Sequence, residues 1–141
     1  GQLQLLAEIN GGTAPTTLTL TMVARTSVTT AIADDCIGIG NQDGITLVGA
    51  GMLAIINGTT NFEYRLNGAA GVSLAVAKDT NPHKFEFVIT ISGVTCDIKI
   101  DDVVRASAVA LTEDTWPRGF RAHMVTGTTD WILQALGFKY T

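Results

Sequence analysis

Residues 84–107, KFEFVITISGVTCDIKIDDVVRAS, predict three short strands joined by two tight turns. The pairs Ser92-Gly93 and Asp101-Asp102 separate the strands, and residues of these types favour turns. Apolar side chains occupy every second position of the first two strands, which places them on one face of a pleated sheet. They are Phe85, Phe87, Ile89, Ile91, Cys96, Ile98 and Ile100. The stretch therefore predicts an antiparallel meander with this face in the core.

Strand-like segments continue on both sides of the meander. Residues 17–25 alternate threonine with leucine, methionine and alanine, which predicts a strand with an apolar face and a hydroxyl-rich face. Asn-Gly pairs at Asn10, Asn57 and Asn67 tolerate the positive φ that tight hairpins need. No segment combines a helical period with caps, so we expect no helix. Further strands are expected at residues 3–5, 36–40, 45–48, 52–56, 62–66, 72–77, 120–125 and 131–140.

Composition predicts one domain that spans residues 1–141. At this length a chain can bury a core without disulfides or metals. No apolar run approaches the roughly 20 residues of a membrane helix, so we expect no membrane partner. The net charge is −4 and the nine basic residues are scattered, which argues against nucleic acid as a partner. Cys36 and Cys96 belong to no metal or redox motif, and we expect small buried residues, with a disulfide between strands as the alternative.

The number of short strands predicts two packed antiparallel sheets, because sheets of this size must bury a face. Their order resembles the jelly rolls of the concanavalin A-like lectin and glucanase superfamily, which includes laminin G-like domains. In the meander, Asp101-Asp102 stands where that family usually has Asp-Gly. Residues 131–136 look like the closing strand that returns beside the first one, and residues 38–44 and 61–65 look like the middle of such a domain. The resemblance implies an all-β, two-sheet antiparallel β-sandwich.

The glycan-cleaving members of that family carry two acidic residues at alternate positions of one strand, and this chain has no such Glu-x-Asp-x-x-Glu segment. Asp97 and Asp101 could share a strand face, but four residues at ~3.3 Å each place them about 13 Å apart. Glycoside hydrolysis needs carboxyl groups roughly 5 to 9.5 Å apart. Lys99 also lies between them. We therefore expect no enzyme, and a glycoside hydrolase that uses Glu86 or Glu63 is the least favoured alternative.

Other chemistry has little support in the sequence. His83 and His123 form no triad or metal cluster, and we expect them to be solvated or structurally bonded. Calcium is conceivable, because oxygen ligands cluster in the loops that contain Asp34-Asp35, Asn41 and Asp43. The same residue types also make turns without any ion, so we expect no cofactor.

Sugar binding is the other property that the resemblance implies, and it uses aromatic faces with amide and carboxylate hydrogen bonds. The aromatic candidates are Trp116, Tyr64, Tyr140 and Trp131, of which Trp131 begins an apolar strand and is expected in the core. Trp116 precedes Pro117 in a polar loop, where it could bind a ligand or instead close one end of the sandwich. The ligand-binding residues that we predict are Trp116, Tyr64, Asn41 and Asp43.

The favoured hypothesis is a non-enzymatic structural and interaction protein. Threonine-rich outer faces, only 16% charged residues and a hydrophobic fraction of 46% indicate that other subunits cover part of the surface. Jelly rolls recur as building and decoration modules of virions. We expect a bacteriophage or virus particle protein on a capsid or tail surface, with copies of itself and other virion proteins as partners. The alternative is an extracellular carbohydrate-binding, lectin-like module with glycans as its partners.

Overall fold

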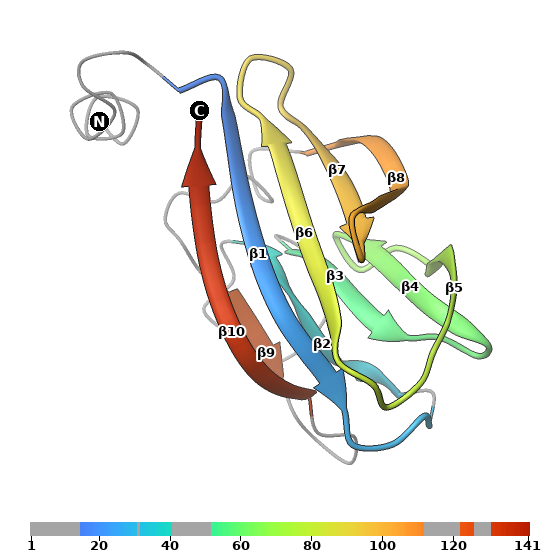
Figure 1. Cartoon of the computed structure of the whole chain (residues 1–141). Coiled ribbons are helices and arrows are strands. Elements are labelled where there is room, and N and C mark those ends of the chain that lie inside the picture. Colours follow the sequence, from blue (N-terminus) through green and yellow to red (C-terminus); the bar gives the residue numbers. More distant parts are fainter. Residues whose placement is uncertain (1–14, 31, 41–51, 112–121, 126–130) are drawn as a thin grey trace.

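A computed structural model describes residues 15–30, 32–40, 52–111, 122–125 and 131–141. These residues form two antiparallel sheets that pack face to face (Figure 1). The front sheet has the strand order β10-β1-β6-β7-β8 and the rear sheet the order β5-β4-β3-β2-β9. The strands are β1 (Thr17–Thr26), β2 (Ile32–Gly40), β3 (Met52–Asn57), β4 (Asn61–Leu66), β5 (Val72–Ala77), β6 (His83–Thr90), β7 (Thr95–Ile100), β8 (Val103–Ala110), β9 (Ala122–Val125) and β10 (Trp131–Tyr140). The predicted all-β sandwich is confirmed, and it is compatible with a jelly roll.

Strand β1 follows the predicted alternation. Its leucine, methionine and alanine side chains are buried, and the threonines between them are half-buried on the outer face of the front sheet. We call the core between the two sheets the shared core. Its bulky side chains come from both sheets and include Phe62 from β4 and Phe85 and Phe87 from β6. One continuous core therefore lies between the sheets.

The meander forms β6, β7 and β8, and its apolar face is buried from Phe85 to Ile100 with one exception. Ile91 is half-buried and lies outside β6, which ends at Thr90. The connection to β7 is a turn over residues 91–94, longer than Ser92-Gly93, in which the N–H of Val94 donates to the carbonyl of Ile91 (3.4 Å). The expectation that Ile91 is a strand core residue was wrong because this turn begins one residue earlier.

Two connections have two successive residues with positive φ, of which Asn67-Gly68 was predicted to tolerate it and Asp101-Asp102 was predicted as a turn. Asp101 and Asp102 have φ values of 52° and 69°, and Asn67 and Gly68 have φ values of 52° and 74°. Two successive residues of this kind make a type I′ turn, whose twist matches that of the strands it joins. Asn57 instead ends β3 with its side chain buried, where its amide donates to the carbonyl of Val28 (3.2 Å).

The rear sheet is buried on both faces at β2 and β3. Leu53 and Ile55 face the shared core, whereas Ala54, Ile56 and Cys36 form a second buried cluster on the opposite face. A β-carbon added at Gly38 on β2 would come too close to the backbone carbonyl oxygen of Leu53 on β3. The close approach of β2 and β3 therefore requires glycine at this position.

Some predicted features lie outside the described residues. They are the strands at residues 3–5 and 45–48 and the turn at Asn10. The expected strands at 36–40 and 120–125 correspond to β2 and β9, with shifted ends. Within the described ranges, no helix is long and apolar enough to cross a membrane.

Candidate functional site

Strand β10 presents an apolar surface at one edge of the front sheet. It pairs antiparallel with β1, so that Phe138 lies opposite Leu20 and Leu136 opposite Met22. Directly opposite residues point to the same face of a sheet. Leu20 and Met22 are buried, yet Leu136 is 53% exposed and Phe138 57% exposed. The core face of the front sheet therefore continues onto β10 as exposed apolar side chains.

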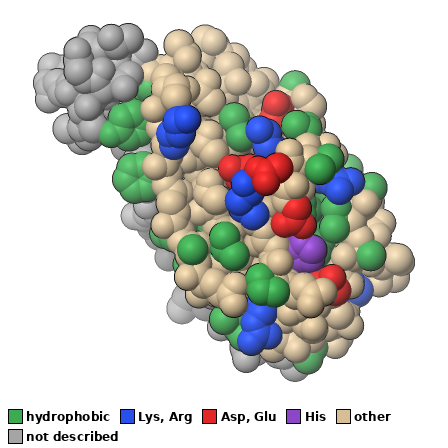
Figure 2. All heavy atoms as spheres, viewed as in Figure 1, with side chains coloured by type: hydrophobic (Ala, Val, Ile, Leu, Met, Phe, Trp, Pro, Cys, Tyr) green, Lys and Arg blue, Asp and Glu red, His purple; other side chains and the backbone are tan. Residues whose placement is uncertain are grey.

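We call this region the β10 surface, made of Leu133, Leu136 and Phe138 on the core face of β10, with Ile132 on the other face, opposite Arg25. Lys139 supplies the only charged side chain of β10. Figure 2 shows hydrophobic side chains along the margin where β10 lies, whereas acidic and basic side chains gather over the middle of the front sheet. The ring of Phe138 stacks on that of Tyr140 with centroids 6.5 Å apart, so the end of the surface is a paired aromatic group.

Backbone hydrogen bonds fix which groups of β10 point away from β1. The N–H of Thr141 donates to the carbonyl of Thr17 and the N–H of Thr17 donates to the carbonyl of Thr141, each over 3.0 Å. In an antiparallel pair, such bonded residues alternate with residues whose polar groups point outward. The N–H and C=O groups of Leu136 and Tyr140 therefore point away from β1.

Two of the other described edges, β5 and β8, carry features that hinder pairing with a further strand. β5 contains Ala75 at φ 54°, and β8 contains Ala108 at φ 52° together with two register shifts against β7. Bulged or short edges are the usual protection of sheets against edge-to-edge pairing. The pairing of β10 with β1 has a single register shift, between Val23 and Ala24 of β1, and is regular over residues 135–140 of β10.

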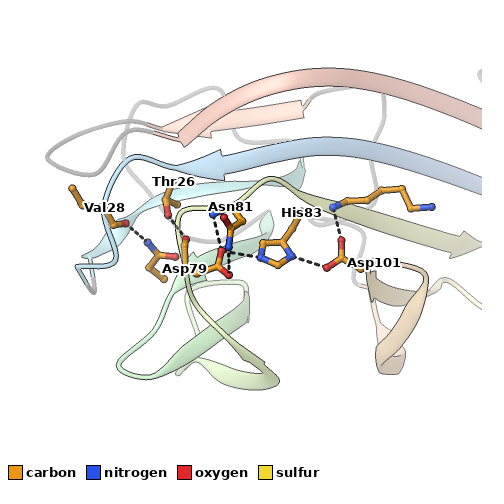
Figure 3. A network of polar contacts seen from close by, with 8 residues as sticks. Thr26, Val28, Asp79, Asn81, His83 and Asp101 are labelled. Carbon is orange, nitrogen blue, oxygen red and sulfur yellow. Dashed lines mark hydrogen bonds and ion pairs between the residues drawn. The ribbon is translucent and has the colours of Figure 1, made fainter.

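A second region, which is polar, lies at the opposite end of the sandwich from the start of β1 (Figures 1 and 3). The His83 side chain stands between Asp79 and Asp101, with Nε2 3.0 Å from Asp79 Oδ1 and Nδ1 2.6 Å from Asp101 Oδ2. The ring packs against Phe62 with centroids 5.4 Å apart. Asp79 also accepts hydrogen bonds from Asn81, and Asp101 accepts one from the backbone N–H of Lys84. We call these three residues, Asp79, His83 and Asp101, the histidine clamp.

The pKa values of the histidine clamp follow from this geometry. Burial opposes the charged ring of His83, but its hydrogen bonds to Asp101 and Asp79 outweigh that cost and raise its pKa above the ordinary value. Burial likewise opposes both carboxylates, but hydrogen bonds from Asn81 and His83 lower the pKa of Asp79. The backbone of Lys84 together with His83 lowers the pKa of Asp101.

The histidine clamp is suited to holding turns together and not to proton transfer. Both ring nitrogens face carboxylates, which accept hydrogen bonds, so this arrangement favours the charged ring with both N–H groups engaged. An imidazolium has no lone pair with which to accept a proton from a substrate. The hydroxyl of Thr26 donates to the backbone carbonyl of Asp79 (3.1 Å), which ties the end of β1 to the same loop (Figure 3).

The predicted ligand-binding residues are placed only in part. Tyr64 lies on β4, where it is half-buried and packs against the shared core. Trp116, Asn41 and Asp43 lie outside the described residues, so no ligand site that combines the four is described. Trp131 is buried in the shared core, as expected. Asp34 and Asp35 lie on β2.

The carboxylates that we weighed for catalysis have structural partners. Asp97 accepts hydrogen bonds from the Ser107 hydroxyl (3.1 Å) and from the N–H of Ala108 (2.7 Å). Glu86 lies 3.8 Å from the ammonium of Lys84. Within the described ranges, no group of three or more His, Cys, Asp or Glu side chains is arranged to hold a metal ion.

Both cysteines are buried and neither forms a disulfide, so the alternative of a disulfide is wrong. Cys96 lies on β7 in the shared core, and Cys36 lies on β2 in the second cluster on the far face of the rear sheet. Burial, with a smaller contribution from Asp97, raises the pKa of the Cys96 thiol to about 12.

The sequence patterns did not reveal either region. The alternation of β10 marks its apolar face but not its exposure, which depends on the strand order. The histidine clamp joins residues that are 18 positions apart, although Asp79-Thr80-Asn81 before His83 is a local signal for a side chain that caps its own turn. No protein-family model matches this chain, and none of the curated proteins compared with it matches.

Proposed function

We propose that this protein is a non-enzymatic structural subunit that acts through contacts with copies of itself and with other proteins. The observation that carries the proposal is the β10 surface, where the core face of the front sheet remains exposed at Leu136 and Phe138. Exposed apolar patches of this kind mark interaction sites in soluble proteins. The histidine clamp supports the same proposal, since both ring nitrogens of His83 are engaged by carboxylates that hold two turns together.

The setting that we propose is the surface of a virus or bacteriophage particle. Two-sheet antiparallel sandwiches recur there, because a rigid sandwich can present one edge or face to a neighbouring subunit and another to solvent. The support is an analogy of fold class, and the concanavalin A-like resemblance of the strand order belongs to the same analogy. Copies of this chain and neighbouring particle proteins are the partners that it implies.

The oligomeric state of the full chain tests this proposal. Light scattering after size-exclusion chromatography should give a molar mass that is a multiple of the monomer mass and that falls on dilution. A monomer at every concentration would contradict the proposal. Glycan binding is tested separately on a glycan array, where the proposed structural role predicts no signal.

A further inference from the structure

We propose that two copies of this chain pair through their β10 strands, antiparallel about a two-fold axis at Gly137, and so join their front sheets into one. This inference rests on the proposed function, because it names the partner of the β10 surface. The partner is a second copy of the same strand. Three observations support a second copy of β10 as the partner of this exposed apolar strand.

The first observation is the contrast between the edges of the two sheets. Among the described residues, β5 and β8 are each interrupted by a residue with positive φ, as described above. β10 keeps a regular stretch over residues 135–140, with leucine and phenylalanine on its core face. A long, regular apolar edge promotes pairing with another chain, and proteins that stay monomeric block such edges. This stretch carries one charge, at Lys139, and no register shift.

The second observation is the direction of the backbone groups. Even-numbered residues of the regular stretch, among them Leu136 and Tyr140, direct their N–H and C=O groups away from β1. Added antiparallel strands use such groups to extend a sheet. Odd-numbered residues such as Gly137 would then form the non-hydrogen-bonded pairs, in which opposite α-carbons lie about 4.5 Å apart.

The third observation is the single charge on the strand, which selects the register. A two-fold axis at Gly137 places Lys139 opposite Ala135 of the second copy, so the two lysines lie four residues apart, or roughly 13 Å. An axis at Phe138 would make the lysines diagonal neighbours at about 7 to 8 Å, which is unfavourable for like charges. An axis at Leu136 would carry the pairing across the register shift at Val23/Ala24.

The Gly137 register also gives matched apolar contacts. Leu136 of each copy then lies opposite Phe138 of the other, so the two most exposed apolar side chains of β10 cover each other. Aromatic and aliphatic pairs across strands stabilise sheets by about 0.2 to 1 kcal/mol each. The exposed core face of one front sheet would continue into that of the next.

Cysteine cross-linking of the full chain tests this register. A β-carbon added at Gly137 meets nothing within 4 Å, so Gly137→Cys should fold normally. The native Cys36 and Cys96 are buried, so the unchanged chain is a control without an accessible thiol. Mild oxidation of Gly137→Cys should give a band at twice the monomer mass that disappears with a reductant. Val104→Cys, on the other edge of the front sheet and 48% exposed at the native residue, should stay monomeric.

A mixture of two variants fixes the register further. Ala135→Cys and Lys139→Cys should cross-link when they are mixed, because these positions lie opposite each other in the proposed pair. Each variant alone should cross-link poorly, since its two thiols would be four residues apart.

Each outcome distinguishes the inference from the proposed function. Oligomers that form without cross-links at Gly137, or that cross-link equally well at Val104, would overturn the β10 pairing and leave the structural role standing. A monomer at every concentration without cross-links would overturn both.

Discussion

His83 explains how a charged ring can sit beside the aromatic end of the core. Its side chain is only 13% exposed and packs between Phe62 and Phe85. Burying an imidazolium is costly unless its N–H groups have acceptors, and here Asp79 and Asp101 each accept one. The residue therefore joins the loop before β6 to the turn between β7 and β8.

The raised pKa of His83 predicts how stability depends on pH. Because the folded pKa lies above the unfolded value near 6.5, the stabilisation is complete below about pH 6 and is lost as pH rises through the folded pKa. The free energy of unfolding should fall by ~1 kcal/mol over that rise, after allowance for the solvent that reaches both carboxylates. Denaturant titrations across this range measure it.

His83→Gln supplies the control for this prediction, since it keeps hydrogen-bonding groups without the titrating ring. Its stability should be lower than that of the unchanged chain in acid and should show no fall as pH rises above about 6.5, the ordinary pKa of histidine. Below about pH 4 the unchanged chain should lose stability again, because Asp79 and Asp101 have lowered pKa values and become protonated there. Parallel pH curves for the two proteins would show that the histidine clamp contributes nothing.

Both thiols should be unreactive in the folded protein. The pKa of Cys96 is raised to about 12 by burial, so almost none of it is thiolate at neutral pH, and Cys36 is fully buried. Titration with Ellman's reagent should detect no thiol in the native state and both in guanidinium. Rapid reaction of one thiol in the native state would show that one of the two clusters opens.

At the scale of the elements, turn chemistry sets the register of the hairpins. Asn67-Gly68 joins β4 to β5 as a type I′ turn, with Gly68 at φ 74°. This conformation costs an L-residue other than glycine about 1 kcal/mol or more. The positive φ therefore favours glycine at position 68.

Gly68→Ala should lower the free energy of unfolding by about 1 kcal/mol. Gly93→Ala is the matched control, because Gly93 also lies in a turn but has no positive φ, and an added β-carbon there meets its nearest atom only at 3.5 Å. Guanidinium unfolding of the two variants measures the difference. Equal stabilities would mean that the β4–β5 turn adopts a different conformation.

The sequence predicts the elements in which one face is buried and the other is half-exposed. β1, β6 and β7 show this alternation directly, and the turns at Asp101 and Asn67 are marked by residues that tolerate positive φ. Burial on both faces of β3 weakens that signal. The exposure of β10 depends on which strand lies beyond it, which is a property of the whole sheet order.

The candidate site was harder to predict than the fold. Of the predicted ligand-binding residues, Tyr64 is described, and it packs against the core instead of standing free. The histidine clamp was missed because Asp101 reaches His83 only after the meander has formed, so no local spacing shows it. The predicted buried role of Trp131 is confirmed, because its place in an apolar strand is a local signal.

At the scale of the whole molecule, the two sides of the sandwich differ. At one side β5 and β8 contact each other across the core, and both strands are irregular. At the other side β10 extends the core face of the front sheet into an exposed apolar strand. This asymmetry is the physical basis of the proposed assembly, since the described residues give β10 a long regular stretch and make β5 and β8 irregular.

The most direct test of this account is the molar mass of Leu136→Lys, measured by light scattering and compared with that of Val72→Lys. Leu136 and Val72 are similarly exposed, at 53% and 48%, but Val72 lies on β5. A lysine on β10 would place a second charge in the proposed interface, so Leu136→Lys should be a monomer while Val72→Lys keeps the mass of the unchanged chain. An unchanged oligomer in Leu136→Lys would contradict assembly through β10.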